Sequence, residues 1–301
     1  MLIKSIGEIL QKSIELGKVK IAIAKADDEE IKLVKLAMEK NLADFILIGD
    51  KKKIKKSLEE NNVEFDENNI IDECDSAKAG SLAVELVNKK QVDIPMKGLM
   101  HTSDFVRAVL NKENGLRTNK RLSQITIFDG ISDSIQFLTD CAINIKPDLK
   151  CKVEIINNCV EAARYFGYSN PKVALIGAVE TVNESMPDSI ESAVLTQMNR
   201  RGQIKDCVVD GPLSLDNAIS EESARIKGIE SSVAGRADIL VASDLVVSNT
   251  FSKALHYYAN KETASIIMGT KSPIIMTSRT DDMKNKLNTI ATIAYIYHMS
   301  K

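Results

Sequence analysis

The sequence contains no tryptophan, few aromatic residues and no long apolar run. Of its 301 residues, 4% are aromatic, 44% are hydrophobic and 27% are charged. This composition is too apolar for a disordered chain, and no stretch approaches the roughly 20 apolar residues that cross a bilayer. The first residues also lack the apolar core of a secretory leader. We therefore expect a soluble, cytoplasmic, globular protein with two domains or one large α/β unit.

Neither sign of charge dominates. Forty Lys and Arg residues face 42 Asp and Glu residues, which leaves a formal net charge of −2. Without an excess of positive charge, little drives the chain toward nucleic acid or an anionic membrane, and we expect neither as a partner. The lysine-rich segment 51–56 opens an expected helix, and such runs are typical of a solvated helix face.

Motifs of several common enzyme classes are missing. The 14 glycines include no Gly-x-Gly, and there is no Gly-x-x-x-x-Gly-Lys-Ser/Thr loop, which argues against ordinary dinucleotide and nucleoside triphosphate sites. His101, His256 and His298 are far apart, and no Gly-x-Ser-x-Gly occurs, so zinc and serine-hydrolase motifs are missing too. The five cysteines contain no Cys-x-x-Cys pair, which predicts buried, reduced thiols.

Short β-branched runs alternate with helical periodicity along the chain. This alternation predicts βαβ units and a largely parallel sheet, with functional loops at the carboxyl ends of its strands. A turn-like break at 144–147 and a long helix at 149–166 indicate a domain boundary. A second alternating series follows, with expected strands at 172–176, 207–209, 238–241 and 264–268 and expected helices at 189–198, 215–227 and 251–260. The pattern leaves open which domain the final helix, at about 282–299, completes. The first series has expected strands at 19–24, 43–49, 92–96 and 124–129, and expected helices at 29–40, 51–60, 76–89 and 103–111.

The segment after the last expected strand, 274–277, carries the most informative chemistry. Ser278 can donate to a developing oxyanion, and the planar guanidinium of Arg279 suits two phosphate oxygens. Asp281 or Asp282 could accept a proton, although a helix N-cap explains an aspartate at this point equally well. We therefore predict a catalytic role for the Ser-Arg pair and leave the proton acceptor open.

A second candidate loop, 97–102, follows the expected strand 92–96. Lys97 and Thr102 could meet an anion at a helix start, while Gly98 allows close approach of the backbone. Capping of the next helix would also explain Thr102.

Three more polar loops end strands of the second series. Each has ordinary turn residues, but their recurrence at successive strand ends predicts a binding surface. Their candidate ligand-binding residues are Asn183, Gly211, Pro212 and Asn249.

Several short motifs, in this order, resemble the phosphate acetyl/butyryltransferase family from about residue 1 to the C-terminus. Leu116-Arg117-Thr118 and the segment 201–205 look more like the butyryl branch than the acetyl branch. The motifs are Met96-Lys97-Gly98 with Thr102, Gly115-Leu116-Arg117-Thr118, Phe137-Leu138-Thr139-Asp140, Val179-Glu180 to Met186-Pro187, Val209-Asp210-Gly211-Pro212-Leu213 and Thr277-Ser278-Arg279.

The resemblance implies a fold and a reaction. The fold is two three-layer α/β domains with mostly parallel sheets and an interdomain active-site cleft, similar to isocitrate and isopropylmalate dehydrogenases, in a homodimer or higher homo-oligomer. The final helix returns to the first domain, so the implied domains are 1–140 plus 277–301, and 141–276. The implied reaction converts butanoyl-CoA, or a similar short-chain acyl-CoA, and phosphate to butanoyl phosphate and CoA by direct ternary-complex transfer. Coenzyme A is then a substrate, and no metal or permanently bound cofactor is required.

The resemblance also assigns residues. Ser278 and Arg279 match the catalytic Ser-Arg pair, and Arg107 matches an arginine implicated in CoA or phosphate binding. Three positions depart from the family: Asn285 stands where acetyl-branch relatives have an aspartate, Ser248 stands where glycine is usual, and Pro95 is unusual before Met96-Lys97-Gly98. Asp281 and Asp282 are the candidates for the role of that aspartate.

Three alternatives follow from these departures and from the fold. They are a phosphate acetyltransferase, a non-catalytic protein that binds CoA or acyl phosphate, and a metal-dependent decarboxylating dehydrogenase. The last lacks a convincing aspartate cluster for its metal.

Overall fold

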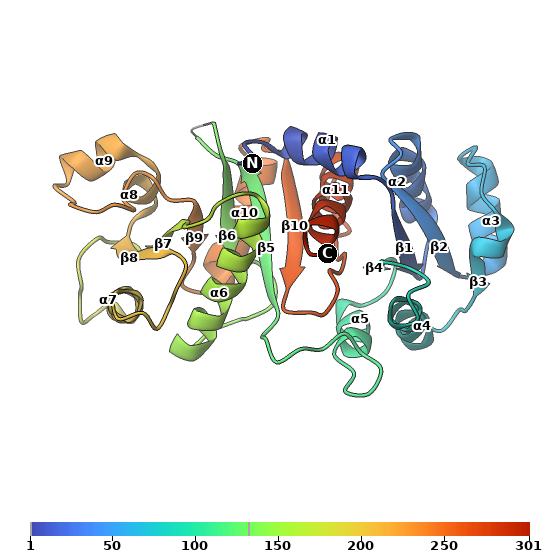
Figure 1. Cartoon of the computed structure of the whole chain (residues 1–301), viewed down its shortest axis with the longest axis horizontal. Coiled ribbons are helices and arrows are strands. Elements are labelled where there is room, and N and C mark those ends of the chain that lie inside the picture. Colours follow the sequence, from blue (N-terminus) through green and yellow to red (C-terminus); the bar gives the residue numbers. More distant parts are fainter. Residues whose placement is uncertain (1, 132) are drawn as a thin grey trace. The chain divides into compact units, whose positions relative to one another are not determined.

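The chain folds into two compact units in the computed structural model, which describes residues 2–131 and 133–301. Unit 1 contains the N-terminal residues up to Ile6 together with Arg121–Thr263. Unit 2 contains Gly7–Lys120 and Ala264–Lys301. Each unit has its own sheet (Figure 1).

Unit 2 is built on a parallel sheet with the strand order β3-β2-β1-β4. The strands β1, β2 and β4 are almost completely buried, as expected for a parallel sheet covered by helices, whereas the edge strand β3 is only partly buried. The strands are β1 (Val19–Ala24), β2 (Ala43–Gly49), β3 (Ile70–Asp72) and β4 (Ile94–Lys97), and the helical elements are α1 (Ile6–Leu16), α2 (Asp28–Glu39), α3 (Lys51–Glu60), η1 (Glu67–Asn69), α4 (Ser76–Asn88), α5 (Thr102–Val109) and α11 (Met283–Met299).

Segment 274–276 extends this sheet beyond β4. Ile275 forms a parallel bridge with Met96, and its N–H donates to the carbonyl of Pro95 at 3.0 Å. The chain then enters α11, which packs against α2 and is buried over most of its length. The final helix therefore belongs to the unit that contains β1–β4, as the resemblance implied.

Unit 1 has the strand order β5-β6-β9-β7-β8. β5 and β6 are antiparallel, and the remaining neighbours are parallel. Its strands are β5 (Ser123–Asp129), β6 (Ile135–Thr139), β7 (Lys172–Ile176), β8 (Val208–Leu213) and β9 (Ile239–Val241), its helices are α6 (Leu149–Tyr165), α7 (Pro187–Arg200), α8 (Leu215–Ile219), α9 (Glu221–Ile226) and α10 (Leu245–Tyr257), and β10 (Thr263–Met268) begins at its last residue.

The α/β class with mostly parallel sheets is confirmed, but the units divide at 120/121 and 263/264 rather than at 140/141 and 276/277. The reason for the first shift is strand pairing. β6 pairs with β9 of the later series, and β5 pairs with β6, so both belong to the sheet of unit 1. The expected helix at 215–227 is also interrupted, because Ser220 has an extended backbone and caps α9.

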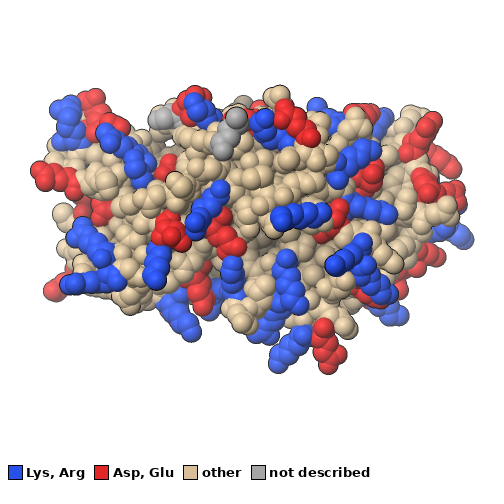
Figure 2. Space-filling view, viewed as in Figure 1, with Lys and Arg blue, Asp and Glu red and all other residues tan. Residues whose placement is uncertain are grey.

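The surface charges are mixed, as the sequence predicted, but one cysteine is not buried. Both signs of charge are interspersed across the face shown in Figure 2. Four of the five cysteines are buried, but Cys74 is exposed, so the prediction of buried thiols was wrong for that residue. Within the described part of the chain, every helix is too short or too polar to span a membrane.

Asp140 organises the chain where β6 ends. Its side chain is buried, and Oδ1 accepts hydrogen bonds from the amides of Gln124, Ala142 and Ile143 at 3.0 to 3.1 Å. Oδ2 accepts the amide of Asn144 at 3.0 Å. One carboxylate thus joins the start of β5 to the turn that leads toward α6.

We expect Asp140→Ala to lower the free energy of unfolding by about 2 to 5 kcal/mol, because four backbone amides in partly buried hydrogen bonds lose a charged acceptor at once. Urea denaturation monitored by circular dichroism measures the loss. Asp133→Ala is the control, since its side chain is 88% exposed and forms a surface ion pair with Lys4. Equal effects of the two substitutions would contradict the role of Asp140.

Candidate active site

The carboxyl ends of β1, β4 and segment 274–276 are neighbours in the sheet of unit 2. Ala24 is paired with Lys97, and the Lys97 N–H donates to the Ile275 carbonyl at 2.9 Å. All three stretches run parallel, so they leave the sheet at one edge. Ser278 and Arg279 therefore follow at the same edge as Lys97.

Lys97 is a buried cation at this edge. The residue is 6% exposed, and its Nζ donates to the Gly98 carbonyl at 3.1 Å. Burial lowers the pKa of Lys97, Glu30 acts in the opposite direction, and the positive charges of Arg279 and Lys286 lower it further. A desolvated ammonium beside other cations is well suited to an anionic ligand, since the anion would offset both costs.

Gly98 is required by packing against β1. Its N–H donates to the Ala24 carbonyl at 2.8 Å, and a Cβ at this position would lie 2.4 Å from the carbonyl oxygen of Lys25. The close approach that the sequence predicted for a ligand is made here to the backbone that follows β1.

The loop after segment 274–276 presents Ser278 and Arg279 at the surface, where both are exposed. The Ser278 N–H donates to Asp281 Oδ2 at 2.9 Å, while Asp282 caps α11 by accepting the Asn285 amide at 2.7 Å. Both carboxylates therefore hold backbone amides in place. Their role as proton acceptors stays a prediction.

Thr102 and Arg107 lie on α5. Thr102 is the first residue of the helix, whereas His101 occupies the N-cap position. Arg107 is exposed and forms an ion pair with Asp104 at 3.4 Å. An exposed guanidinium with one partner on its own helix can reorient toward a ligand at low cost.

Three charged residues at the same edge had no predicted role: Glu29, Glu30 and Lys286. The side chain of Lys286 is 4% exposed, and its Nζ lies 2.5 Å from Glu29 Oε1. Glu30 accepts the Asp27 amide at 3.1 Å in a capping box, and desolvation raises the pKa of Glu30 to about 7. In the sequence, the acidic first turn of α2 indicates only a helix start.

Two of the ligand-binding residues predicted in unit 1 form hydrogen bonds to the backbone of the same unit. Asn183 Oδ1 accepts the Ser185 amide at 2.9 Å, and Asn249 Nδ2 donates to the Cys141 carbonyl at 3.0 Å. Ligand binding by these two residues stays a prediction.

Local packing also constrains three further residues of unit 1: Gly211, Pro212 and Ser248. A Cβ at Gly211 would lie 2.6 Å from the Leu175 Cβ, and Pro212 is buried. Ser248 is buried in the first turn of α10, where its hydroxyl donates to the Asp244 carbonyl at 3.0 Å. Ligand binding by Gly211 and Pro212 likewise stays a prediction.

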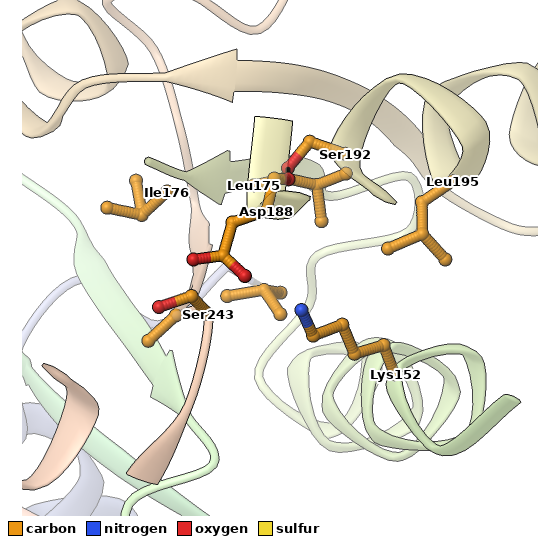
Figure 3. Close-up of a pocket in the computed structure, with 9 residues that line it drawn as sticks. Lys152, Leu175, Ile176, Asp188, Ser192, Leu195 and Ser243 are labelled. Carbon is orange, nitrogen blue, oxygen red and sulfur yellow. Dashed lines mark hydrogen bonds between the residues drawn. The ribbon is translucent and has the colours of Figure 1, made fainter. Parts of the chain in front are cut away.

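A small cavity lies at the carboxyl ends of β7 and β9 in unit 1. Lys152 of α6 and Asp188 of α7 point toward the same space, next to Ser243 (Figure 3). Its volume is about 10 Å³, enough for about one water molecule. Lys152 is buried and paired with Glu191. These residues have no distinctive signature in the sequence, because a lysine within a helix pattern carries no signal of burial.

Among residues 2–131 and 133–301, no group of three or more His, Cys, Asp or Glu side chains could hold a metal ion. The absence of a metal requirement stays a prediction from the resemblance.

We expect Gly98→Ala to destabilise unit 2 by about 1 to 3 kcal/mol, because the added Cβ would collide with two backbone carbonyls. Gly80→Ala in α4 is the matched control. Its Cβ would meet only the flexible Met100 side chain at 3.2 Å, and alanine favours the helix. Denaturant unfolding compares the two variants, and a Gly98→Ala protein as stable as Gly80→Ala would contradict the packing argument.

The chain is similar to several known proteins in sequence and in fold. Phosphate butyryltransferase of Clostridium beijerinckii is 43% identical over 99% of this chain and 99% of the relative. Phosphate acetyltransferase of Thermotoga maritima is 41% identical over 95% of this chain and 98% of the relative. Among solved structures, a branched-chain phosphotransacylase from Enterococcus faecalis V583 matches with a TM-score of 0.81 and 30% identity, over 93% of this chain and 99% of that one.

The model of the phosphate acetyl/butaryl transferase family matches residues 76–294. This match includes β4 with Lys97 and the loop of Ser278 and Arg279. The chain belongs to the phosphate acetyl/butaryl transferase family.

Proposed function

We propose that the protein converts butanoyl-CoA, or a similar short-chain acyl-CoA, and phosphate to the acyl phosphate and CoA by direct transfer in a ternary complex. The observation that carries this proposal is the 43% identity, over nearly the whole of both chains, to a relative named phosphate butyryltransferase. CoA is then a substrate rather than a resident cofactor.

The edge that carries Lys97, Ser278 and Arg279 suits this chemistry. Acyl transfer passes through a tetrahedral oxyanion, which the Ser278 hydroxyl is assigned to stabilise as a hydrogen-bond donor. The phosphate is assigned to Arg279, whose guanidinium can bind two oxygens, and to the buried ammonium of Lys97. Further binding roles are assigned to Gly98, Thr102, Arg107, Asn183, Gly211, Pro212 and Asn249.

Acetyl transfer is the second candidate function. It is supported by the 41% identity to a relative named phosphate acetyltransferase. One methylene in an apolar pocket changes specificity by only about 1 to 3 kcal/mol, so a few side chains separate the two substrates.

Phosphate-dependent release of free CoA thiol from butanoyl-CoA tests the proposal, with acetyl-CoA and a phosphate-free reaction run beside it. A higher kcat/KM for butanoyl-CoA is the expected result. Preference for acetyl-CoA would assign the acetyl reaction. CoA binding without release would instead identify a non-catalytic binding protein and overturn the proposal.

We expect Ser278→Ala to reduce kcat about 100- to 1000-fold, as loss of one oxyanion donor usually does. Ser81→Ala is the control, because Ser81 is exposed on α4 and its hydroxyl donates to the Ala77 carbonyl of its own helix. Steady-state kinetics with saturating phosphate measures both variants. An unchanged kcat for Ser278→Ala would remove its assigned role.

A homodimer or higher homo-oligomer in the cytoplasm is part of the same proposal. The assembly into an oligomer is supported by three apolar side chains on or next to α7, spaced four residues apart and 37% to 40% exposed: Met186, Ile190 and Val194. Sedimentation velocity of the purified chain tests the assembly, and a monomer at all concentrations would contradict it. Cell fractionation tests the location.

A further inference from the structure

The proposed reaction requires a group that accepts a proton. When CoA attacks an acyl phosphate, the thiol must lose its proton, and a positioned carboxylate can accept it. Two carboxylates lie close to Ser278 in the sequence: Asp281 accepts the Ser278 amide, and Asp282 accepts the Asn285 amide. The inference below rests on the proposed function and concerns a carboxylate from another part of the chain.

Glu30 is brought to this edge by the sheet. It lies in the first turn of α2, which follows β1, and β1 is the direct neighbour of β4. The loops after the two strands touch, since the Leu99 amide donates to the Lys25 carbonyl at 2.8 Å. The helix α11 also contacts α2, because Lys286 Nζ forms an ion pair with Glu29.

Charged groups reach this edge from α2, β4 and the stretch that leads into α11. Lys97 ends β4, Arg279 precedes α11, and Lys286 lies within α11. Glu29 is the acidic neighbour on α2 itself, and it is paired with Lys286. Lys97 interacts electrostatically with Glu30, Arg279 and Lys286, so one cluster joins the carboxyl group to the residues assigned to phosphate.

We propose that Glu30 is the proton-accepting carboxylate of acyl transfer, acting between the CoA thiol and the departing phosphate at the edge formed by β1, β4 and segment 274–276. Its carboxylate takes the thiol proton while the sulfur forms a bond to the acyl carbon. The bond from the acyl carbon to the phosphate oxygen breaks, and phosphate leaves with that electron pair. Protonated Glu30 then gives its proton to the phosphate, which restores the carboxylate and yields thioester and hydrogen phosphate.

The ionisation of Glu30 suits this task. Desolvation raises its pKa to about 7, against hydrogen bonds from the Asp27 amide and its own amide; Glu29 raises it further, and Lys286 lowers it. A base with a pKa near the working pH is both available and strong enough to accept a proton. In the direction from acyl phosphate and CoA, activity should rise with pH through about 7, as Glu30 loses its proton.

The substitution Glu30→Gln removes the proton-accepting carboxylate but keeps a side chain that can cap α2. Glutamine can still accept the Asp27 amide through its side-chain carbonyl, so the capping box and the start of α2 are kept. We expect kcat to fall about 100- to 10,000-fold in the direction from acyl phosphate and CoA. The residual rate should follow ionisation of the thiol, near pH ~8.5, instead of a group near 7.

Two further variants accompany this measurement. Glu39→Gln, at the exposed end of the same helix, is the matched control and should keep the wild-type rate and pH profile. Lys286→Met removes a charge that lowers the pKa of Glu30, so it should move the rise in activity to higher pH. This shift is measurable even if Glu30→Gln folds poorly.

The outcomes distinguish the two proposals. A wild-type protein without phosphate-dependent turnover of any acyl-CoA would refute the proposed function. An active wild type with a Glu30→Gln variant that keeps a kcat within about threefold and the same rise near pH 7 would overturn the role of Glu30 alone. An unchanged pH profile in Lys286→Met would also argue against it.

Discussion

The short parallel contact between β4 and segment 274–276 is the interaction on which the candidate site depends. Two backbone hydrogen bonds join stretches far apart in the sequence, from the Lys97 amide to Ile275 and from the Ile275 amide to Pro95. A third, from Ser272 Oγ to the Asp93 carbonyl at 2.8 Å, fixes where this contact begins. Because the pairing is parallel, Ser278 leaves the sheet at the edge where Lys97 lies. An antiparallel return would have carried it to the opposite edge.

Burial of charge is the second constraint on this edge. Lys97 and Lys286 are both more than nine-tenths buried, and desolvating two ammonium groups costs several kcal/mol unless opposite charges lie nearby. Glu29 and Glu30 supply those charges from the first turn of α2. Burial at the same edge raises the pKa of Glu30 to about 7. Stability and proposed chemistry therefore depend on one set of contacts.

The periodicity of the sequence predicted most elements well. Predicted strands at 19–24, 43–49 and 172–176 have the observed bounds of β1, β2 and β7, because a buried parallel strand is a continuous apolar run between polar turns. The predicted domain boundary and one predicted helix were wrong, because contacts with residues distant in the sequence or at a helix cap determine them. β5 resembles any strand in sequence, yet its antiparallel partner β6 places it in unit 1. Ser220 interrupts a helical pattern because its side chain caps the next helix.

The sequence by itself determined the α/β class, the positions of the polar loops and the resemblance that the family match confirms, since these rest on local periodicity and on short motifs. It also singled out Lys97, Ser278 and Arg279 as candidates, because each follows an expected apolar strand. Only the tertiary structure decided how the carboxylates differ. Asp282 caps α11, whereas Glu30 lies partly desolvated beside Lys97. The ionisation of a group depends on burial and on charges that reach it through space, and neither is a property of its neighbours in the chain.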